Sequence, residues 1–259
     1  CEPVCPSAGL SLTPRQRIVI ARELRFNEKD TRINQKKLLE DIDYNSNKTC
    51  AADGLCEIMC PVNINTGNFV KTLRKDSHSK AGDWCVAWIQ SHFKFTQSVL
   101  RGLITITHWW SKFMGDSIPH VLSKVLNKAT NRSTPIWNKN LSTPPVSLRA
   151  SEFKNNIDFI YYPSCVGRVI SANNARESLS KVLIDLCEFS NIQLFIPEKI
   201  QGTCCGMPFS SKGYIQAGKT MTEQTVDLIF KVSEQGEIPI LVDTTQCSFH
   251  LIEAGSDLD

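Results

Sequence analysis

Two short cysteine runs, each closed by Cys-Pro, constrain the fold of this chain more than any other feature of its sequence. The first run holds Cys1 and Cys5, and the second holds Cys50, Cys56 and Cys60. Both runs end in Cys-x3-Cys-Pro. The last cysteine of each run lies four residues after the one before it, and the proline that follows redirects the chain. Thiolates grouped on tight turns suit soft metal centres, and two such runs predict a folded pair of centres.

The spacing of the runs is that of iron-sulfur ligation. A run of the form C-x2-C-x2-C-x3-C-P supplies its first three thiolates to one cluster, while its fourth cysteine ligates the cluster of the other run. On this pattern Cys50, Cys56 and Cys5 serve one 4Fe-4S cluster, and Cys60 and Cys1 serve the other. A complete first run needs further cysteines ahead of Cys1, and the last residues close no recognisable element. We therefore expect a fragment truncated at both ends.

The second run departs from this pattern at its second position. Where a ligand cysteine is expected the chain has Asp53, which leaves three thiolates for this cluster. Carboxylate is a harder ligand than thiolate. We expect either a 3Fe-4S cluster or a 4Fe-4S cluster with Asp53 or solvent on the unique iron. Asp53 equally fits a turn residue ahead of Gly54.

The composition excludes several classes of protein. The 259 residues include 11 cysteines, an odd number gathered into clusters, which favours metal ligation in a reducing compartment, and hence the cytoplasm, over a disulfide framework. The formal charge of +3 is not gathered into a Lys/Arg run, so no nucleic-acid partner is expected. The 5 histidines lie apart, and no G-x-G-x-x-G run follows an apolar run. We therefore expect no catalytic residue for substrate oxidation and no flavin-binding loop in this chain.

Helical patterns surround the cysteine runs. Thr13 fits an N-cap and Pro14 a first helical residue. A second helix is predicted over residues 31–43, with a break at residues 45–47 ahead of the second run. Helices between the runs indicate an all-helical first domain.

A long helical region is predicted from Asn65-Thr66-Gly67 to about Met114. Its large apolar residues recur every three, four or seven positions: Trp84, Trp88, Phe95, Val99, Leu103, Ile106, Trp110 and Phe113. We expect this face to pack against the cluster core. Because basic residues alternate with the aromatic ones, peripheral contact with the inner face of the cell membrane is the alternative. The longest uncharged stretch, residues 102–111, is too short to span a bilayer.

The composition changes after this region. Residues rich in Asn, Ser, Thr and Pro predict a linker over 130–150. Beyond it three apolar runs alternate with two amphipathic stretches, and the runs cover residues 157–162, 192–196 and 238–242. This order predicts strand, helix, strand, helix, strand in a small parallel sheet. The expected architecture is an α-helical ferredoxin-like domain over residues 1–129 and a small α/β domain over residues 151–259.

Cysteines follow each of the three predicted strands. Cys165 follows the first strand, Cys204 and Cys205 follow the second, and Cys247 follows the third. Because the carboxyl ends of parallel strands meet at one edge of a sheet, where open α/β sheets place ligands, we expect these four thiols to converge as candidate metal ligands. Two further cysteines on apolar helix faces are interpreted as small buried hydrophobes: Cys85 and Cys187.

These motifs resemble those of a known superfamily. The order Pro163-Ser-Cys165, Cys204-Cys205-Gly206 and Asp243-Thr-Thr-Gln-Cys247 resembles the cysteine-rich CCG domain of heterodisulfide reductases, of the glycolate oxidase iron-sulfur subunit and of lactate-utilisation proteins. With Cys50-Ala-Ala-Asp-Gly-Leu-Cys56 and Cys60-Pro-Val-Asn-Ile-Asn-Thr-Gly67, the chain is most similar to the C-terminal iron-sulfur half of fused FAD-dependent D-lactate or D-2-hydroxy-acid dehydrogenases.

The resemblance implies an electron-transfer module. It implies that a D-2-hydroxy acid, such as D-lactate or D-2-hydroxyglutarate, is oxidised at FAD in an upstream domain of the same parent chain, and that electrons pass through iron-sulfur clusters to a quinone or cytochrome. The chain departs from the heterodisulfide-type pattern at Thr244, where the first Cys of a closing C-x2-C is expected. The four cysteines of the α/β domain then form a weaker metal site or shape a site beside the electron acceptor.

Two alternatives stay open. One is a separate iron-sulfur subunit, like that of glycolate oxidase or anaerobic glycerol-3-phosphate dehydrogenase. The other is a zinc-stabilised binding module, since cysteine clusters also hold structural zinc, although the C-x2-C knuckles typical of zinc sites are absent from the sequence.

Overall fold

The structure is a computed structural model that describes residues 2–26, 40–129, 136–138, 143–148, 156–171 and 177–256. Contacts between residues divide the chain into two compact units. The first unit joins Cys1–Ala87 to Gly206–Thr220, and the second joins Trp88–Cys205 to Met221–Asp259. The sequential division expected from composition stays a prediction, because much of its linker lies outside the described residues.

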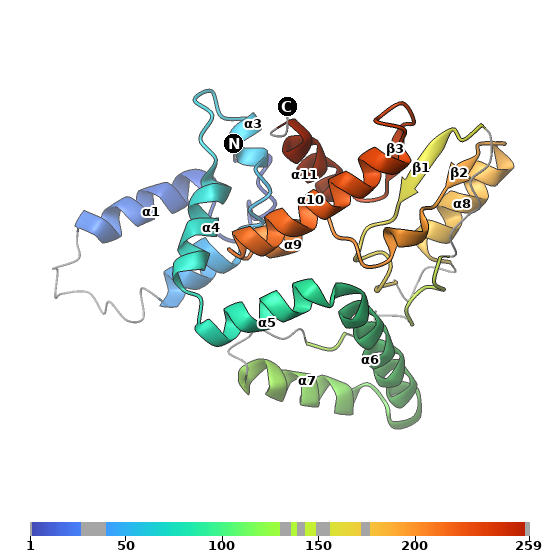
Figure 1. Ribbon diagram of the computed structural model, residues 1–259. Coiled ribbons are helices and arrows are strands. Elements are labelled where there is room, and N and C mark those ends of the chain that lie inside the picture. Colours follow the sequence, from blue (N-terminus) through green and yellow to red (C-terminus); the bar gives the residue numbers. More distant parts are fainter. Residues whose placement is uncertain are drawn as a thin grey trace. The chain divides into compact units, whose positions relative to one another are not determined.

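The first unit is built from helices (Figure 1). Its described elements are α1 (Pro14–Phe26), η1 (Asp43–Lys48), α3 (Leu55–Ile58), α4 (Thr66–Asp76), α9 (Met207–Ser210) and most of α5 (Lys80–Ser91). The predicted start of α1 is confirmed: the Thr13 N–H donates to Oε1 of Gln16 at 2.8 Å, and Pro14 is the first helical residue. The predicted start of α4 is confirmed too, since the Asn65 side chain accepts the Asn68 N–H.

The chain stays helical ahead of the second cysteine run. The first part of the helix predicted over residues 31–43 lies outside the described residues, and the rest continues into the π-helix η1. The break predicted at residues 45–47 is therefore wrong. Side-chain hydrogen bonds close this turn: Asn45 Nδ2 donates to the Asp41 oxygen at 2.9 Å, and the Thr49 hydroxyl donates to the Asn45 oxygen at 2.6 Å.

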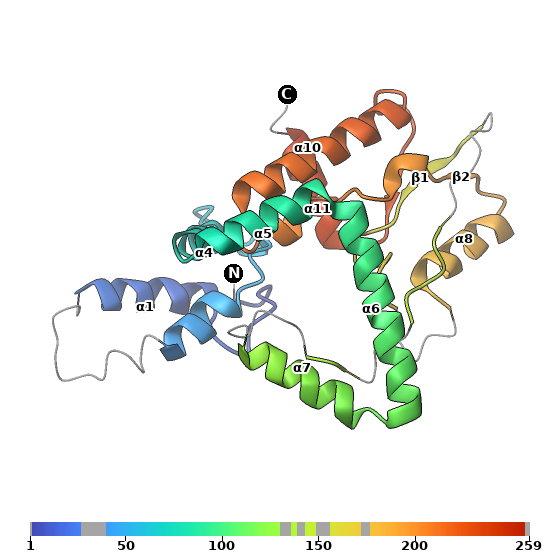
Figure 2. The same ribbon diagram turned by 60° about the horizontal axis from the view of Figure 1, so that its bottom comes forward.

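The region predicted as one long helical stretch is a series of separate helices. It comprises α4, α5 and α6 (Phe93–Met114), and α7 (Ser117–Ala129) follows. The predicted end at Met114 is confirmed. Gly115, with φ of 80° and ψ of 162°, adopts a backbone conformation that is open mainly to glycine, and it separates α6 from α7. Figure 2 shows α6 and α7 joined at this turn.

The second unit contains the predicted parallel sheet. Its strands are β1 (Phe159–Tyr162), β2 (Leu194–Phe195) and β3 (Ile240–Val242), in the order β2-β1-β3. The intervening and following elements are α8 (Leu179–Phe189), η2 (Glu198–Ile200), most of α10 (Ile215–Val232) and α11 (Thr245–Ser256). The predicted alternation of strands and helices is confirmed, although the strands are shorter than the apolar runs.

Burial in the second unit concentrates on the central strand. Ile160, Tyr161 and Tyr162 of β1 are fully buried. The two tyrosines form a core cluster with Ile196 and Ile200, which lie after β2. A strand paired on both sides and covered on both faces has little freedom to shift. The position of β1 thereby fixes where the loop that follows it begins.

The large apolar residues of α5 and α6 do not form a buried face. The side chains of Trp84, Trp88, Phe95, Val99, Leu103, Ile106, Trp110 and Phe113 are each between 41% and 70% exposed. The prediction that this face belongs to a buried core is therefore contradicted. Among the described residues, no helix is at once long and apolar enough to cross a bilayer.

Candidate metal centre

Four cysteines meet at the carboxyl edge of the sheet in the second unit. Cys165 lies in the turn after β1, Cys204 and Cys205 lie in the loop after η2, and Cys247 lies in the first turn of α11. The Sγ atoms of Cys165 and Cys204 are 3.6 Å apart, and those of Cys205 and Cys247 are 3.3 Å apart. The predicted convergence of these thiols is confirmed, and their role as metal ligands stays a prediction.

The four thiols are removed from water and free of disulfide bonds. Cys204 and Cys205 are at most 1% exposed, and Cys165 and Cys247 are 8% exposed. The hydrogen bond with Cys204 lowers the pKa of Cys165. Contacts with Cys165 and Cys205 raise the pKa of Cys204, and contact with Cys205 raises the pKa of Cys247. Closely packed sulfurs therefore cannot all ionise unless positive charge compensates them.

A carboxylate at the end of β3 fixes the loop that carries Cys165. Asp243 Oδ1 accepts the Ser164 N–H at 2.8 Å, and its Oδ2 accepts the Tyr161 hydroxyl at 3.0 Å. The same loop is tight at Gly167, because a Cβ there would lie 3.0 Å from Ser164 Oγ and 3.2 Å from Asp243 Oδ2, and these side chains would have to shift. Burial raises the pKa of Tyr161, so its phenol stays a neutral donor.

Arg168 ties the Cys165 loop to the segment that leads into the Cys-Cys pair. Its side chain is 9% exposed, and its guanidinium donates to the backbone oxygens of Ile200 and Thr203. The hydrogen bond with Cys204 has the largest effect on the pKa of Cys165 and lowers it. The positive charge of Arg168 lowers the same pKa by a smaller amount. A buried cation therefore lies in the loop that carries Cys165.

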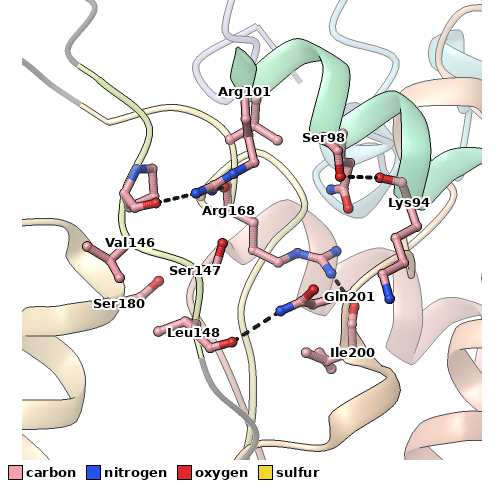
Figure 3. A pocket seen from close by; sticks show the side chains of 14 residues that line it. Lys94, Ser98, Arg101, Val146, Ser147, Leu148, Arg168, Ser180, Ile200 and Gln201 are labelled. Atoms are coloured by element: carbon pink, nitrogen blue, oxygen red, sulfur yellow. Dashed lines mark hydrogen bonds between the residues drawn. The ribbon is translucent and has the colours of Figure 1, made fainter. Parts of the chain in front are cut away.

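The polar face of α6 lines a pocket next to Arg168 (Figure 3). Side chains that line this pocket include Lys94, Ser98, Ser147 and Gln201. Gln97 Nε2 donates to the Cys165 backbone oxygen at 3.4 Å. Arg101 donates to the backbone oxygens of Arg168 and Pro145. These bonds attach α6 to the loop that carries Cys165.

Two threonines of α10 hold the backbone of the Cys-Cys pair. Thr225 Oγ1 donates to the Cys204 oxygen and Thr222 Oγ1 to the Cys205 oxygen, each at 2.8 Å. Thr225 is 0% exposed and Thr222 is 6% exposed. An unpaired buried carbonyl costs about 1–3 kcal/mol, so these hydroxyls stabilise the position of both cysteines.

In the first unit Cys5 lies against a buried arginine. Arg17 is 1% exposed, and its guanidinium donates to the Ser46 backbone oxygen at 2.8 Å and to the Ser7 hydroxyl at 2.7 Å. Its Nη1 lies 3.8 Å from Cys5 Sγ. Although burial opposes ionisation, hydrogen bonding to Ser7 and the charge of Arg17 lower the pKa of Cys5.

Cys50 lies near a second buried arginine, Arg74, which is 8% exposed. The Arg74 guanidinium donates to three backbone oxygens, those of Asn47, Cys50 and Ser211. Burial raises the pKa of Cys50, while the charges of Arg17 and Arg74 act in the opposite direction. A negative charge on Cys5 would also raise the pKa of Cys50, so the two thiols interact. The first unit therefore sets two cysteines beside two buried cations.

Asp53 makes a turn contact in this structure. Its Oδ1 accepts the Leu55 N–H at 3.3 Å, and the intervening Gly54 has φ of 81°. This geometry favours the interpretation of Asp53 as a turn residue. Its role as an iron ligand stays a prediction.

The remaining cysteines of the two runs lie near α3. Cys56 is buried within this helix, and Cys60 follows it at a partly exposed position. Hydrogen bonds from the backbone N–H groups of Ile64 and Val62 lower the pKa of Cys60. Cys1 lies outside the described residues.

Across the described ranges, the structure brings no three His, Cys, Asp or Glu side chains into the arrangement of a metal site. The donor chemistry itself fits soft metals, because the described cysteines carry free thiols, and the Cys5 thiol lies beside a guanidinium group. Of the two cysteines interpreted as buried hydrophobes, Cys187 is 6% exposed, as predicted. Cys85 is exposed, so the interpretation is wrong for it.

The residues that position the cysteines are not evident from the sequence. Arg17, Arg74 and Arg168 each use a buried guanidinium to hold backbone or side-chain oxygens, yet nothing in the sequence separates them from exposed arginines. Asp243 offers a weak signal, since an acidic residue directly follows an apolar run and precedes Cys247.

Comparison with known proteins assigns no family to the chain: no family model, no curated protein and no solved structure matches it. The chemistry of the chain's own residues is therefore the basis for assigning a function.

Proposed function

We propose that the chain is an iron-sulfur electron-transfer module with a ferredoxin-like helical domain and a CCG-type α/β domain. It would serve an FAD-dependent domain of the same parent chain that oxidises a D-2-hydroxy acid such as D-lactate or D-2-hydroxyglutarate, and pass electrons to a quinone or cytochrome. The observation that carries the proposal is the gathering of four buried thiols from three loops at one edge of a parallel sheet.

The ligand assignment follows the two cysteine groups. The residues that would hold two clusters, one of them 3Fe-4S or completed by Asp53, are Cys1, Cys5, Cys50, Cys56 and Cys60. The candidates for a further site in the second unit are Cys165, Cys204, Cys205 and Cys247. Thiolates are the ligands that iron-sulfur clusters require, and most of these sulfurs are shielded from water.

Buried guanidinium groups favour thiolates at both places. Arg17 approaches Cys5, Arg74 bonds the Cys50 backbone, and Arg168 stands near Cys165. A buried cation favours ionised sulfur and offsets part of the cost of burying negative charge. Hydrogen bonds and charge around the sulfurs also set the potential of an iron-sulfur centre.

The chemistry explains why such a module belongs beside a flavin. Oxidation of a 2-hydroxy acid to a 2-oxo acid gives FAD two electrons and two protons together, and reduction of a quinone to a quinol consumes the same numbers. An iron-sulfur cluster supplies one-electron transfer when it is bound. The chain's own residues position the cysteine sulfurs, exclude water from them and fix the loops that carry them. This arrangement suits a module that carries electrons one at a time between two reactions that each transfer two.

The proposal is tested by iron and sulfide analysis of the full-length protein purified without oxygen. Replacing Cys5 or Cys50 with Ser should remove a large part of the bound iron and sulfide and slow reduction of a quinone by the D-2-hydroxy acid. Cys187→Ser is the matched control, because this buried cysteine stands on α8 outside both groups, and it should leave metal content unchanged.

Two results would overturn the proposal. Colourless protein with stoichiometric zinc and no sulfide would establish the zinc-stabilised module instead. Undiminished acceptor reduction after replacement of the cysteines of both groups would show that they carry no electrons.

A further inference from the structure

Helix α6 carries an apolar stripe along one side. The members recur every three or four residues, a spacing that places them on one face of an α-helix: Phe95, Val99, Leu103, Ile106, Trp110 and Phe113. Each is between 42% and 70% exposed. Trp109 borders the stripe at 57% exposure, and its ring centre lies 4.7 Å from that of Phe113.

This stripe lies opposite the side of α6 that is held by the rest of the second unit. Arg101, whose position falls on the far side of the helix, donates to the backbone oxygens of Arg168 and Pro145. Gln97 on the same side donates to the Cys165 oxygen. Figure 3 shows Arg101 reaching from α6 toward these loops. The polar side anchors α6, so the apolar stripe cannot turn inward.

Helix α7 extends the apolar surface. It follows α6 across a short turn (Figure 2) and contacts it. Its exposed apolar side chains, each between 45% and 60% exposed, are Ile118, Val121, Leu122, Val125 and Leu126. Together with the stripe and Trp109 they form what we call the α6–α7 face. Large exposed apolar surface of this kind often marks an interaction site.

The charge of the same segment is strongly positive. Residues 93–129 contain five of the 29 Lys and Arg residues and one of the 26 Asp and Glu residues, Asp116. The segment therefore has a formal charge of +4, while the rest of the chain has a charge of −1. By helical spacing Lys94, Arg101 and Lys112 fall on the side opposite the apolar stripe.

We propose that the α6–α7 face docks the protein on the surface of an anionic phospholipid bilayer. Helices that lie in a membrane interface combine Trp, Phe and Leu on one face with Lys and Arg on the other. Helix α6 spans about 33 Å, so it offers a long line of apolar contact parallel to the membrane. Trp109 and Trp110 suit the interface itself, because indole combines an apolar ring with an N–H donor.

The positive charge selects the bilayer over an uncharged apolar partner. A Lys or Arg directly at an anionic surface strengthens binding up to about fivefold, and this contribution falls with distance from the surface and with added salt. A charge on the polar side of α6 therefore contributes less than one beside the apolar stripe. Since the chain outside this segment has almost no net charge, the attraction would come from the segment itself. This inference does not depend on bound iron, so vesicle binding and metal content test separate claims.

The test is sedimentation of the full-length protein with vesicles. We expect binding to mixed phosphatidylcholine–phosphatidylglycerol vesicles, at least tenfold weaker binding to pure phosphatidylcholine vesicles, and release by high salt. Ile106→Asp should weaken binding to the mixed vesicles about tenfold or more, because it removes apolar contact and adds repulsion. Brominated acyl chains should quench the tryptophan fluorescence of the bound protein.

Thr105→Asp is the matched control. It adds the same charge to the neighbouring residue on the polar side of α6, at an exposed position, and should weaken binding less than threefold. Equal loss in the two variants would overturn the assignment of the stripe as the contact. Absence of vesicle binding, with a concentration-dependent dimer that Ile106→Asp abolishes, would show that a second copy covers the face and would overturn the proposal.

Discussion

A single buried arginine, Arg17, organises the surroundings of Cys5. Its guanidinium bonds the Ser46 oxygen and the Ser7 hydroxyl from a site that is 1% exposed. We expect Arg17→Met to lower the free energy of unfolding by about 3 kcal/mol, because buried oxygens lose charged donors. Urea unfolding followed by circular dichroism measures the change.

The control for this prediction lies on the same helix. Arg22 of α1 pairs with its neighbour Glu23 at 3.1 Å, and its side chain is 61% exposed. Arg22→Met should change the free energy of unfolding by no more than about 0.5 kcal/mol. Similar losses in the two variants would mean that the Arg17 contacts contribute no more than a surface charge does.

The hydroxyl of Thr225 is the corresponding residue-scale support in the second unit. Thr225→Val keeps the shape of the side chain but leaves the buried Cys204 oxygen without this donor. We expect a loss of about 1–3 kcal/mol in the free energy of unfolding. The matched variant Thr220→Val, also on α10, removes a hydroxyl bonded to the exposed Gln216 oxygen and should cost about 0.5 kcal/mol or less. Equal costs would contradict the supporting role of Thr225.

The convergence of the cysteines could be predicted from the sequence, and the residues that hold them in place could not. The spacing of Cys165, Cys204 and Cys247 after three apolar runs was sufficient to predict their convergence. Arginine is normally exposed, so a buried Arg168 follows only from the three-dimensional position of the carbonyls it bonds. The thiols carry a sequence signal because their chemistry is rare, whereas the supporting contacts are specified by the fold.

At the scale of elements, the start of α4 depends on a glycine. A Cβ on Gly67 would lie 2.9 Å from Asn65 Oδ1 and 3.2 Å from the Cα of Ala52, in the second cysteine run. Gly67→Ala should therefore lower the free energy of unfolding by about 1–3 kcal/mol despite the higher helix propensity of alanine. Thermal and urea unfolding measure the loss.

The same substitution in an open part of α6 should act in the opposite direction. Nothing lies within 4 Å of a Cβ at Gly102, so Gly102→Ala should raise the free energy of unfolding by about 0.5–1 kcal/mol. If both alanine variants stabilise the protein, α4 does not pack closely on the second cysteine run.

Element prediction succeeded where local signals and burial agree. The cap at Asn65 and the three apolar runs marked α4 and the strands correctly. It failed at residues 45–47, where asparagines that usually favour turns bond backward to a helical chain. The periodicity of apolar residues in α6 identified the helix but not the environment of its apolar side. The same periodicity fits a helix face buried in a core and a helix face exposed for binding.

At the scale of the whole molecule, the two units differ in what stabilises them. The second unit has a sheet and a core cluster that includes Tyr161 and Tyr162. In the first unit, Cys5 and Cys50 stand beside the buried cations Arg17 and Arg74. Ionised sulfur on a bound metal would offset those charges, so bound iron should contribute more to the stability of the first unit.

On the proposed function, removal of the bound iron should therefore loosen the first unit more than the second. Hydrogen exchange of iron-loaded and chelator-treated protein, followed by mass spectrometry, should show protection falling at least tenfold in α1 and η1, a change of about 1.4 kcal/mol or more. Protection in β1 and β3 should fall less, because their pairing and the tyrosine core need no metal. The double variant Cys5→Ser/Cys50→Ser should reproduce the loss in α1 and η1 without a chelator, while Cys187→Ser should not. An equal fall in both units would refute the expected asymmetry, because the sheet would then depend on iron as much as α1 and η1 do.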